Sequence, residues 1–294
     1  MLGLDGTRMT QAAALRALLT TGNIVAAPGA SDSLTARLVQ RAGFPAIYMT
    51  GFGATASRLG TPDIGLLSQT EMTEHARNMV RAVSIPIIAD ADTGYGGPAN
   101  IHRTVREYIQ AGVAAIHLED QVAPKRCGQM AGIRLMERGE SAKRLACAVQ
   151  ARGRDDLLII GRTDAMPAMG AAEAIDRAKL YLDAGVDLVF VDGIKTIAEV
   201  EAVAREVAGP KVVSIVDGNE TVALTAADLQ HMGFSVVLYA VTALFAATRT
   251  IDAALRHLHA AGTPAGGPEP VSYAEFSEIV GLDGFKQLDD RFGV

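Results

Sequence analysis

The chain has 294 residues, of which 49% are hydrophobic and 20% are charged, so it is long enough to bury a large core and most of its length is not disordered. Its 27 Lys and Arg residues against 33 Asp and Glu residues give a net charge of −6, which argues against binding to nucleic acid or to an anionic membrane surface. The two cysteines, Cys127 and Cys147, form no C-x-x-C motif, and we expect reduced thiols in a cytoplasmic protein.

The chain begins with a helical stretch that precedes the first apolar run. Residues 10–21 predict a helix that caps the bottom of the fold. The N-terminal region has no long apolar run, so we expect neither a secretory signal nor a membrane span.

Short apolar runs and helical stretches then alternate over most of the chain. The runs are nearly continuous in hydrophobicity, which is typical of strands buried on both faces. They cover residues 24–28, 46–51, 85–92, 114–120, 157–164, 187–193, 211–218 and 235–241. Eight strands alternating with helices predict an α/β fold, the (β/α)8 or TIM barrel. A doubly wound open sheet is the alternative, but the first run is followed by GASDSLTA rather than by a dinucleotide-binding glycine pattern.

The C-terminal part of the chain lies outside this repeat. Residues 260–270 are rich in Gly and Pro and predict a linker. Two short helical stretches come after it, SYAEFSEIVGL and DGFKQLDDRF. We therefore divide the chain into a barrel over residues 1–261 and a linker with C-terminal helices over residues 262–294.

Polar residues collect where the predicted strands end. Asp90 and Asp92 end the third strand, and Glu119, Arg162 and Asp192 end the fourth, fifth and sixth. In a barrel of this type the functional groups lie at the C-terminal strand ends. Because Asp90 and Asp92 are two residues apart on a strand, we expect them to face the same side. With Glu119 they predict an oxygen-rich site for Mg²⁺ or Mn²⁺, the alternative being helix caps and ion pairs with Arg162.

The segment after the fourth strand, residues 120–135, is long for a connection of this kind and predicts a lid. Lys125 and Arg126 flank Cys127 in it, and their charge is expected to lower the pKa of the thiol. Cys127 is thus a candidate acid or base. Cys147, in the helical stretch KRLACAVQAR, is expected to be a buried small residue.

Taken together, these motifs resemble the isocitrate lyase/phosphoenolpyruvate mutase superfamily, in particular its 2-methylisocitrate lyase-like branch. The segments GASDSLTARLVQRAGFPAIYMTG, TPDIGL, ADADTGYGG, EDQVAPKRCG and RTDA carry the resemblance, which spans nearly the whole chain. It implies a homodimer or homotetramer in which the C-terminal helices are swapped between subunits. It also implies a Mg²⁺ ion held by Asp90, Asp92 and Glu119, largely through water, with Asp63 supporting the lid or the metal shell.

The resemblance further implies which residues act on a small carboxylate substrate. Cys127, Tyr48, Arg162 and Lys125 take the catalytic positions, with Cys127 as proton donor, Tyr48 as base or orienter and Arg162 as carboxylate clamp. The substrate-binding positions are Thr50, Gly51, Phe52, Asp90, Gly128, Gln129, Arg162, Asp192 and Ser214.

This chain departs from the family pattern at three of those positions. Gln129 stands where the lyase signature has His, Asp192 where methylisocitrate lyases have Glu, and Ser214 where they have Asn. The leading hypothesis is a Mg²⁺-dependent carbon–carbon lyase that cleaves a 2-methylisocitrate-like or 2-alkylmalate-like acid to a 2-oxo acid and a carboxylate. The alternatives are an oxaloacetate hydrolase or decarboxylase, a carboxyphosphonoenolpyruvate-type mutase, or a non-catalytic barrel that binds a 2-oxo acid.

Overall fold

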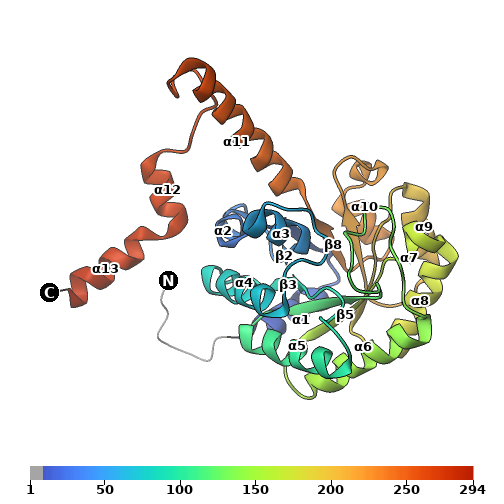
Figure 1. Cartoon of the computed structure of the whole chain (residues 1–294). Coiled ribbons are helices and arrows are strands. Elements are labelled where there is room, and N and C mark those ends of the chain that lie inside the picture. The colour runs from blue at the N-terminus through green and yellow to red at the C-terminus, as the bar shows by residue number, and fades with distance from the viewer. Residues whose placement is uncertain (1–8, 294) are drawn as a thin grey trace.

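The computed structural model describes residues 9–293 and contains a closed barrel of eight parallel strands in chain order, with β1 paired to β8 (Figure 1). The strands are β1 (Val25–Ala30), β2 (Ile47–Met49), β3 (Ile87–Asp90), β4 (Ala115–Glu119), β5 (Leu158–Thr163), β6 (Leu188–Val191), β7 (Lys211–Ile215) and β8 (Val236–Tyr239). Each lies within one of the eight predicted apolar runs apart from the last residues of β1, so the predicted (β/α)8 barrel is confirmed.

The helices of the described residues lie mostly around the outside of the barrel (Figure 1). They are α1 (Gln11–Thr20), α2 (Ser33–Arg41), α3 (Gly51–Leu59), α4 (Gln69–Ala82), α5 (Pro98–Ala111), α6 (Arg138–Arg152), α7 (Ala165–Met169), α8 (Ala171–Asp183), α9 (Ile197–Glu206), the 3-10 helix η1 (Glu220–Ala223), α10 (Ala226–His231), α11 (Thr242–Ala261), α12 (Tyr273–Val280) and α13 (Leu282–Phe292).

Two apolar clusters hold the barrel together. One lies between the strands and the surrounding helices, and the other fills the barrel interior with side chains such as Ile88, Leu158 and Phe190. Ala12 and Leu15 of α1 pack on the interior cluster, so the first helix closes one end of the barrel as the sequence predicts. This leaves the opposite end, where the strands terminate, for polar groups.

The strand register places the polar residues side by side at that end. Asp90 on β3 is level with His117 on β4, and Glu119 on β4 is level with Arg162 on β5. Arg162 is in turn level with Phe190 on β6. Neighbouring parallel strands are about 4.8 Å apart, so this register alone brings the charged side chains into contact distance.

The C-terminal helices do not pack on the barrel as the earlier helices do. In Figure 1, α11 runs outward from the barrel, and α12 and α13 lie outside the ring of helices, on the side of α2. No residue of these three helices is buried, and Ile251, Leu255, Phe285 and Phe292 are among the large apolar side chains that they expose. α12 contacts α2, where Arg37 donates to the carbonyl oxygen of Ile279 at 3.2 Å and Arg41 lies 4.0 Å from Glu278.

In the part of the chain that the structure describes, no helix combines the length and the apolar character that a membrane crossing needs. The N-terminal region in which we expect no secretory signal lies partly outside the described residues, because these begin at residue 9.

Candidate active site

A cavity of about 350 Å³ opens at the C-terminal end of the barrel strands. Its wall brings together side chains that are far apart in the sequence, from β2 to the loop after β7 and the start of α11. Ten of the residues predicted from sequence line it: Tyr48, Thr50, Phe52, Asp63, Asp90, Cys127, Gln129, Arg162, Asp192 and Ser214. The other five predicted residues do not line this cavity: Gly51, Asp92, Glu119, Lys125 and Gly128.

The N-terminus of α3 forms part of this wall. Thr50 is the helix N-cap, and its side chain accepts a hydrogen bond from the backbone N–H of Gly53 at 3.3 Å. At Gly51 a Cβ atom would lie only 2.4 Å from Oδ2 of Asp90. Glycine is therefore required for the close approach of the Asp90 carboxylate to the first turn of α3, whose free N–H groups favour anions.

Asp90, His117 and Tyr48 form a buried polar row. The Tyr48 hydroxyl lies 3.1 Å from Nε2 of His117, and Nδ1 of His117 lies 3.7 Å from Oδ1 of Asp90. Burial lowers the pKa of His117 to about 4, so this imidazole is neutral. Burial, then the Asp90 charge, raises the pKa of Tyr48 well above its usual value, so the phenol keeps its proton. Burial alone would also raise the pKa of Asp90, but His117, Lys125 and Arg162 outweigh it and hold the pKa at about 2.

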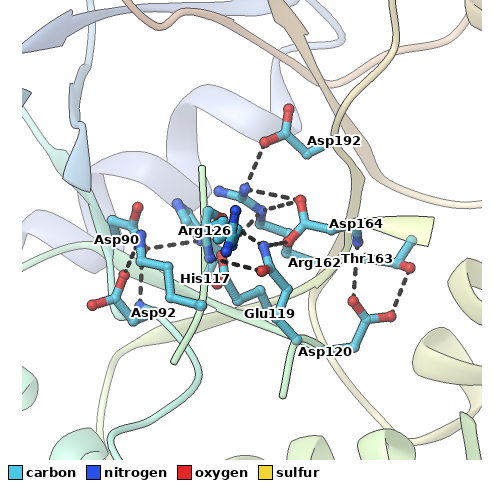
Figure 2. A network of polar contacts seen from close by, with 12 residues as sticks. Asp90, Asp92, His117, Glu119, Asp120, Arg126, Arg162, Thr163, Asp164 and Asp192 are labelled. Atoms are coloured by element: carbon cyan, nitrogen blue, oxygen red, sulfur yellow. Dashed lines mark hydrogen bonds and ion pairs between the residues drawn. The ribbon is translucent and has the colours of Figure 1, made fainter. Parts of the chain in front are cut away.

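Arg162 lies among three carboxylates (Figure 2). Its Nη2 is 2.6 Å from Asp192 Oδ2 and 2.9 Å from Asp164 Oδ1, and its Nε is 3.4 Å from Glu119 Oε2. Burial would lower the pKa of Arg162, but these three charges raise it above its already high value, so the guanidinium stays positive. The predicted carboxylate clamp is therefore already partly occupied by side chains of the protein.

Lys125 bridges two acidic side chains instead of entering the cavity. Its Nζ is 2.8 Å from Asp63 and 2.7 Å from Asp92 Oδ1. Lys125 and Asp92 line a second cavity of about 490 Å³, between α4, α5 and the loop after β4. The Asp63–Lys125 pair joins the loop after α3 to the predicted lid.

Asp90 and Asp92 do not face one side as alternating residues of a strand, so that prediction is wrong. The strand ends at Asp90, and Asp92 has a φ of 46°, so strand alternation does not set its direction. Its backbone N–H donates to Oδ1 of Asp90 at 2.8 Å, which fixes the turn. Asp92 still lies in the same network as Asp90, through the ammonium group of Lys125.

The acidic residues fit a divalent ion that is held mainly through water. Between residues 9 and 293, no group of three or more His, Cys, Asp or Glu side chains is arranged to hold a metal directly. However, both carboxylate oxygens of Glu119 and Nδ1 of His117 are buried without a hydrogen-bond partner. Burial raises the pKa of Glu119 well above its usual value and that of Asp92 to about 6. A nearby cation would relieve these costs, and Mg²⁺ keeps most of its waters and uses one or two carboxylates.

The lid lies closed over the Arg162 cluster. The backbone N–H of Cys127 donates to the carbonyl oxygen of Asp63 at 3.1 Å, and an isolated bridge pairs Gln121 with Leu135 at the base of the loop. A Cβ atom on Gly128 would lie 2.6 Å from Asp192 Oδ2 and 3.0 Å from Arg162 Nη2. The loop therefore needs a glycine where it crosses the ion cluster.

The predicted lowering of the Cys127 pKa is wrong. Burial raises the pKa of this thiol to about 11, with the Asp192 charge adding to the effect. The ammonium group of Lys125 pairs with Asp63 and Asp92, and the guanidinium of Arg126 donates to the carbonyl oxygen of Ala131. Neither cation therefore pairs with the sulfur of Cys127. Cys127 is thus a neutral thiol that holds a proton over the cavity. Cys147 is half-buried rather than buried, and its thiol donates to the carbonyl oxygen of Pro98 at 3.5 Å.

The structure adds site residues that the prediction did not include. His117 and Asp164 lie in the buried networks around Tyr48 and Arg162, and Lys195, Asn219 and Phe245 line the cavity. His117 and Asp164 stand at predicted strand ends, which is a usable signal. Lys195 and Asn219 lie in loops whose path no sequence pattern defines, and Phe245 belongs to a helix whose apolar residues suggest core packing instead.

Comparisons with known proteins agree with this geometry. The sequence profile of a family described as phosphoenolpyruvate phosphomutase matches residues 15–259. The chain is 39% identical over 285 residues to 2,3-dimethylmalate lyase of Eubacterium barkeri, covering 97% of this chain and 99% of that protein.

Solved structures are similar over almost the full length. A structure of oxaloacetate acetylhydrolase in complex with the inhibitor 3,3-difluorooxalacetate has a TM-score of 0.93 and 34% identity, covering 98% of this chain and 99% of that one. A structure of phosphonopyruvate hydrolase in complex with oxalate and Mg²⁺ has a TM-score of 0.87 and 32% identity, covering 97% and 99%. These relatives act by different reactions, so similarity alone leaves the substrate open.

Proposed function

Because the chain belongs to the phosphoenolpyruvate mutase/isocitrate lyase superfamily, we propose that it is a Mg²⁺-dependent carbon–carbon lyase that cleaves a 2-hydroxy dicarboxylate of the 2-alkylmalate type. The observation that carries this proposal is a neutral thiol, Cys127, lining the same cavity as Tyr48, Asp90 and Arg162. A lyase of this type needs both a proton donor and a group that binds the 2-oxo acid, and residues suited to each role line this one cavity.

In the proposed reaction, the substrate hydroxyl gives its proton to a water molecule in the cavity, and the bond between C2 and C3 breaks. The bonding electrons remain on C3, and the carbonyl of a 2-oxo acid forms at C2. Cys127 then donates its proton to C3, which completes the second product, a carboxylate, and the thiolate takes up a proton from water before the next turnover. With a pKa of about 11, Cys127 is protonated at neutral pH and suits this role.

The other site residues bind and orient the substrate. The carboxylate of the 2-oxo acid part lies at the N-terminus of α3, against Thr50, Gly51 and Phe52. Tyr48 stays neutral, held by His117, and orients the reacting hydroxyl. The second carboxylate of the substrate lies near Arg162, Gly128 and Gln129, and Asp192 and Ser214 shape the remaining wall.

Lys125 acts as a positioning residue in this proposal, since it ties the lid to Asp63 and Asp92. Asp90, Asp92 and Glu119 would hold Mg²⁺, largely through water, and when bound the ion supplies Lewis-acid stabilisation of the developing carbonyl oxygen. The carboxylate oxygens of Glu119, which have no hydrogen-bond partner and only the 3.4 Å ion pair with Arg162, support this assignment.

We also propose that residues 262–294 pack on a neighbouring subunit. The helices α11, α12 and α13 expose large apolar side chains, which is typical of a surface that binds another protein. The eight strands of the barrel are already closed into a ring, so these helices are not needed to complete it. The functional unit is then a homodimer or homotetramer, with the barrel over residues 1–261 as the catalytic domain.

A second candidate is hydrolysis of oxaloacetate, which the similarity to oxaloacetate acetylhydrolase favours. The two reactions differ in their products. We would incubate the purified chain and Mg²⁺ with a panel of 2-alkylmalates, 2-methylisocitrate and oxaloacetate, and measure 2-oxo acid and oxalate release. Pyruvate or another 2-oxo acid from an alkylmalate supports the lyase, whereas oxalate from oxaloacetate alone supports the hydrolase.

A further inference from the structure

The lid carries an amide whose two ends have different surroundings. Oε1 of Gln129 accepts a hydrogen bond from Nδ2 of Asn219 at 3.2 Å. Nε2 of Gln129 is buried and has no hydrogen-bond partner, although Gln129 lines the 350 Å³ cavity. Because Asn219 binds the amide oxygen of Gln129, the group left without a partner is the NH₂ donor. A buried donor without a partner costs free energy unless a ligand accepts its hydrogen bond.

Asn219 is itself held by two loops at the barrel rim. It lies after β7, where its backbone N–H donates to the carbonyl oxygen of Val216 at 3.1 Å. Its Nδ2 also lies 3.5 Å from the carbonyl oxygen of Ile194, in the loop after β6. One side chain therefore connects the lid to the loops after β6 and β7.

A bound carboxylate in this cavity would require such a donor. Arg162 already contacts Asp164, Asp192 and Glu119, so much of its charge is balanced before any substrate arrives. A substrate carboxylate near the lid therefore needs further hydrogen-bond donors. The amide group of Gln129 can be such a donor, and it is neutral at every physiological pH.

We propose that Asn219 is a positioning residue that latches the closed lid and orients the Gln129 amide so that Nε2 donates to an oxygen of the bound substrate. The latch stands on the geometry alone, while the donor role rests on the proposed function, a site for a dicarboxylate. Neither amide titrates, so the Asn219–Gln129 contact itself does not change with pH.

The latch can be tested without any turnover. Trypsin cleaves after Arg126 and Arg134, which are exposed in the lid, and mass spectrometry can measure these two cleavages separately from cleavage elsewhere. Asn219→Ala removes the latch and should raise both rates several-fold in the full-length chain. Asn219→Asp should leave them near the wild-type rates, because its carboxylate can accept from Nε2 of Gln129. Asn78→Ala, an exposed change on α4, is the matched control.

The donor role is tested by binding of 3,3-difluorooxalacetate with Mg²⁺, measured by calorimetry, because this dicarboxylate reports binding whichever reaction the protein catalyses. Asn219→Asp turns the Gln129 oxygen towards the ligand, and Gln129→Glu places a charge there. Both should weaken binding by about 10-fold or more, as expected for loss of a hydrogen bond to a charged group. Asn219→Ala should weaken it less, since the freed amide can still rotate.

Each outcome decides one part. Unchanged lid cleavage in Asn219→Ala would overturn the latch. Wild-type binding by Asn219→Asp would overturn the donor orientation. A wild-type chain that binds no 3,3-difluorooxalacetate would overturn the donor role, while release of a 2-oxo acid from alkylmalates would still decide the proposed function and the cleavage rates would still decide the latch.

Discussion

Replacing Cys127 by serine removes the proposed proton donor with the smallest change in shape. Proton transfer by a positioned side chain contributes about 10²- to 10⁴-fold in rate, which corresponds to about 2.7–5.4 kcal/mol of barrier. A serine hydroxyl is a far weaker acid than a thiol with a pKa of about 11. We therefore expect kcat of Cys127→Ser to fall by about 10²- to 10⁴-fold, with little change in the midpoint of thermal unfolding because Cys127 lies in a loop over the cavity.

The assay is Mg²⁺-dependent release of a 2-oxo acid, with Cys147→Ser as the matched control. Cys147 lies on α6 and packs partly against the core, so its replacement should spare kcat and lower the free energy of unfolding by about 1 kcal/mol. Alkylation of Cys127 by iodoacetamide adds an independent check. Because the reagent attacks the thiolate, the rate should rise with pH towards a midpoint of about 11. Near-normal turnover by Cys127→Ser would refute the proton-donor role, and an alkylation midpoint below 8.5 would refute the raised pKa.

Three further predictions concern the metal, the lid and the assembly. Chelation by EDTA should abolish turnover without unfolding the chain, as measured by circular dichroism, and full activity in metal-free buffer would contradict the Mg²⁺ proposal. Gly128→Ala should raise KM by at least about 10-fold, because the added Cβ would lie 2.6 Å from Asp192 Oδ2 and would keep the lid from closing. An unchanged KM would show that the closed lid tolerates the methyl group. Light scattering at micromolar concentration should give a dimer or larger, and removal of residues 262–294 should lower the assembly state, whereas a monomeric full-length chain would exclude the swap.

The sequence was sufficient to predict the barrel, because eight strands buried on both faces leave a pattern of nearly continuous apolar runs. It also placed most polar residues of the cavity, since the ends of parallel strands converge. Asp90, Glu119 and Arg162 lie level with polar or aromatic neighbours through the strand register.

Features that depend on contacts between distant segments could not be predicted. The charge of Lys125 was assigned to its neighbour Cys127, but in the fold its ammonium group lies against Asp63, which is 62 residues away. The direction of Asp92 results from a left-handed backbone conformation beyond the strand end, which strand alternation does not describe. The Asn219–Gln129 contact joins two loops separated by 90 residues, and neither loop has a periodic pattern.

Turnover in D₂O tests the central claim most directly. We predict that 2,3-dimethylmalate incubated with the chain and Mg²⁺ in D₂O yields pyruvate and propionate, and that the propionate carries one deuterium at C2 in a single configuration. A fixed thiol above one face of the departing carbon, exchanged to S–D by the solvent, requires that result. Propionate that is deuterated without stereochemical preference, or the absence of any 2-oxo acid product while oxaloacetate yields oxalate, would contradict the account.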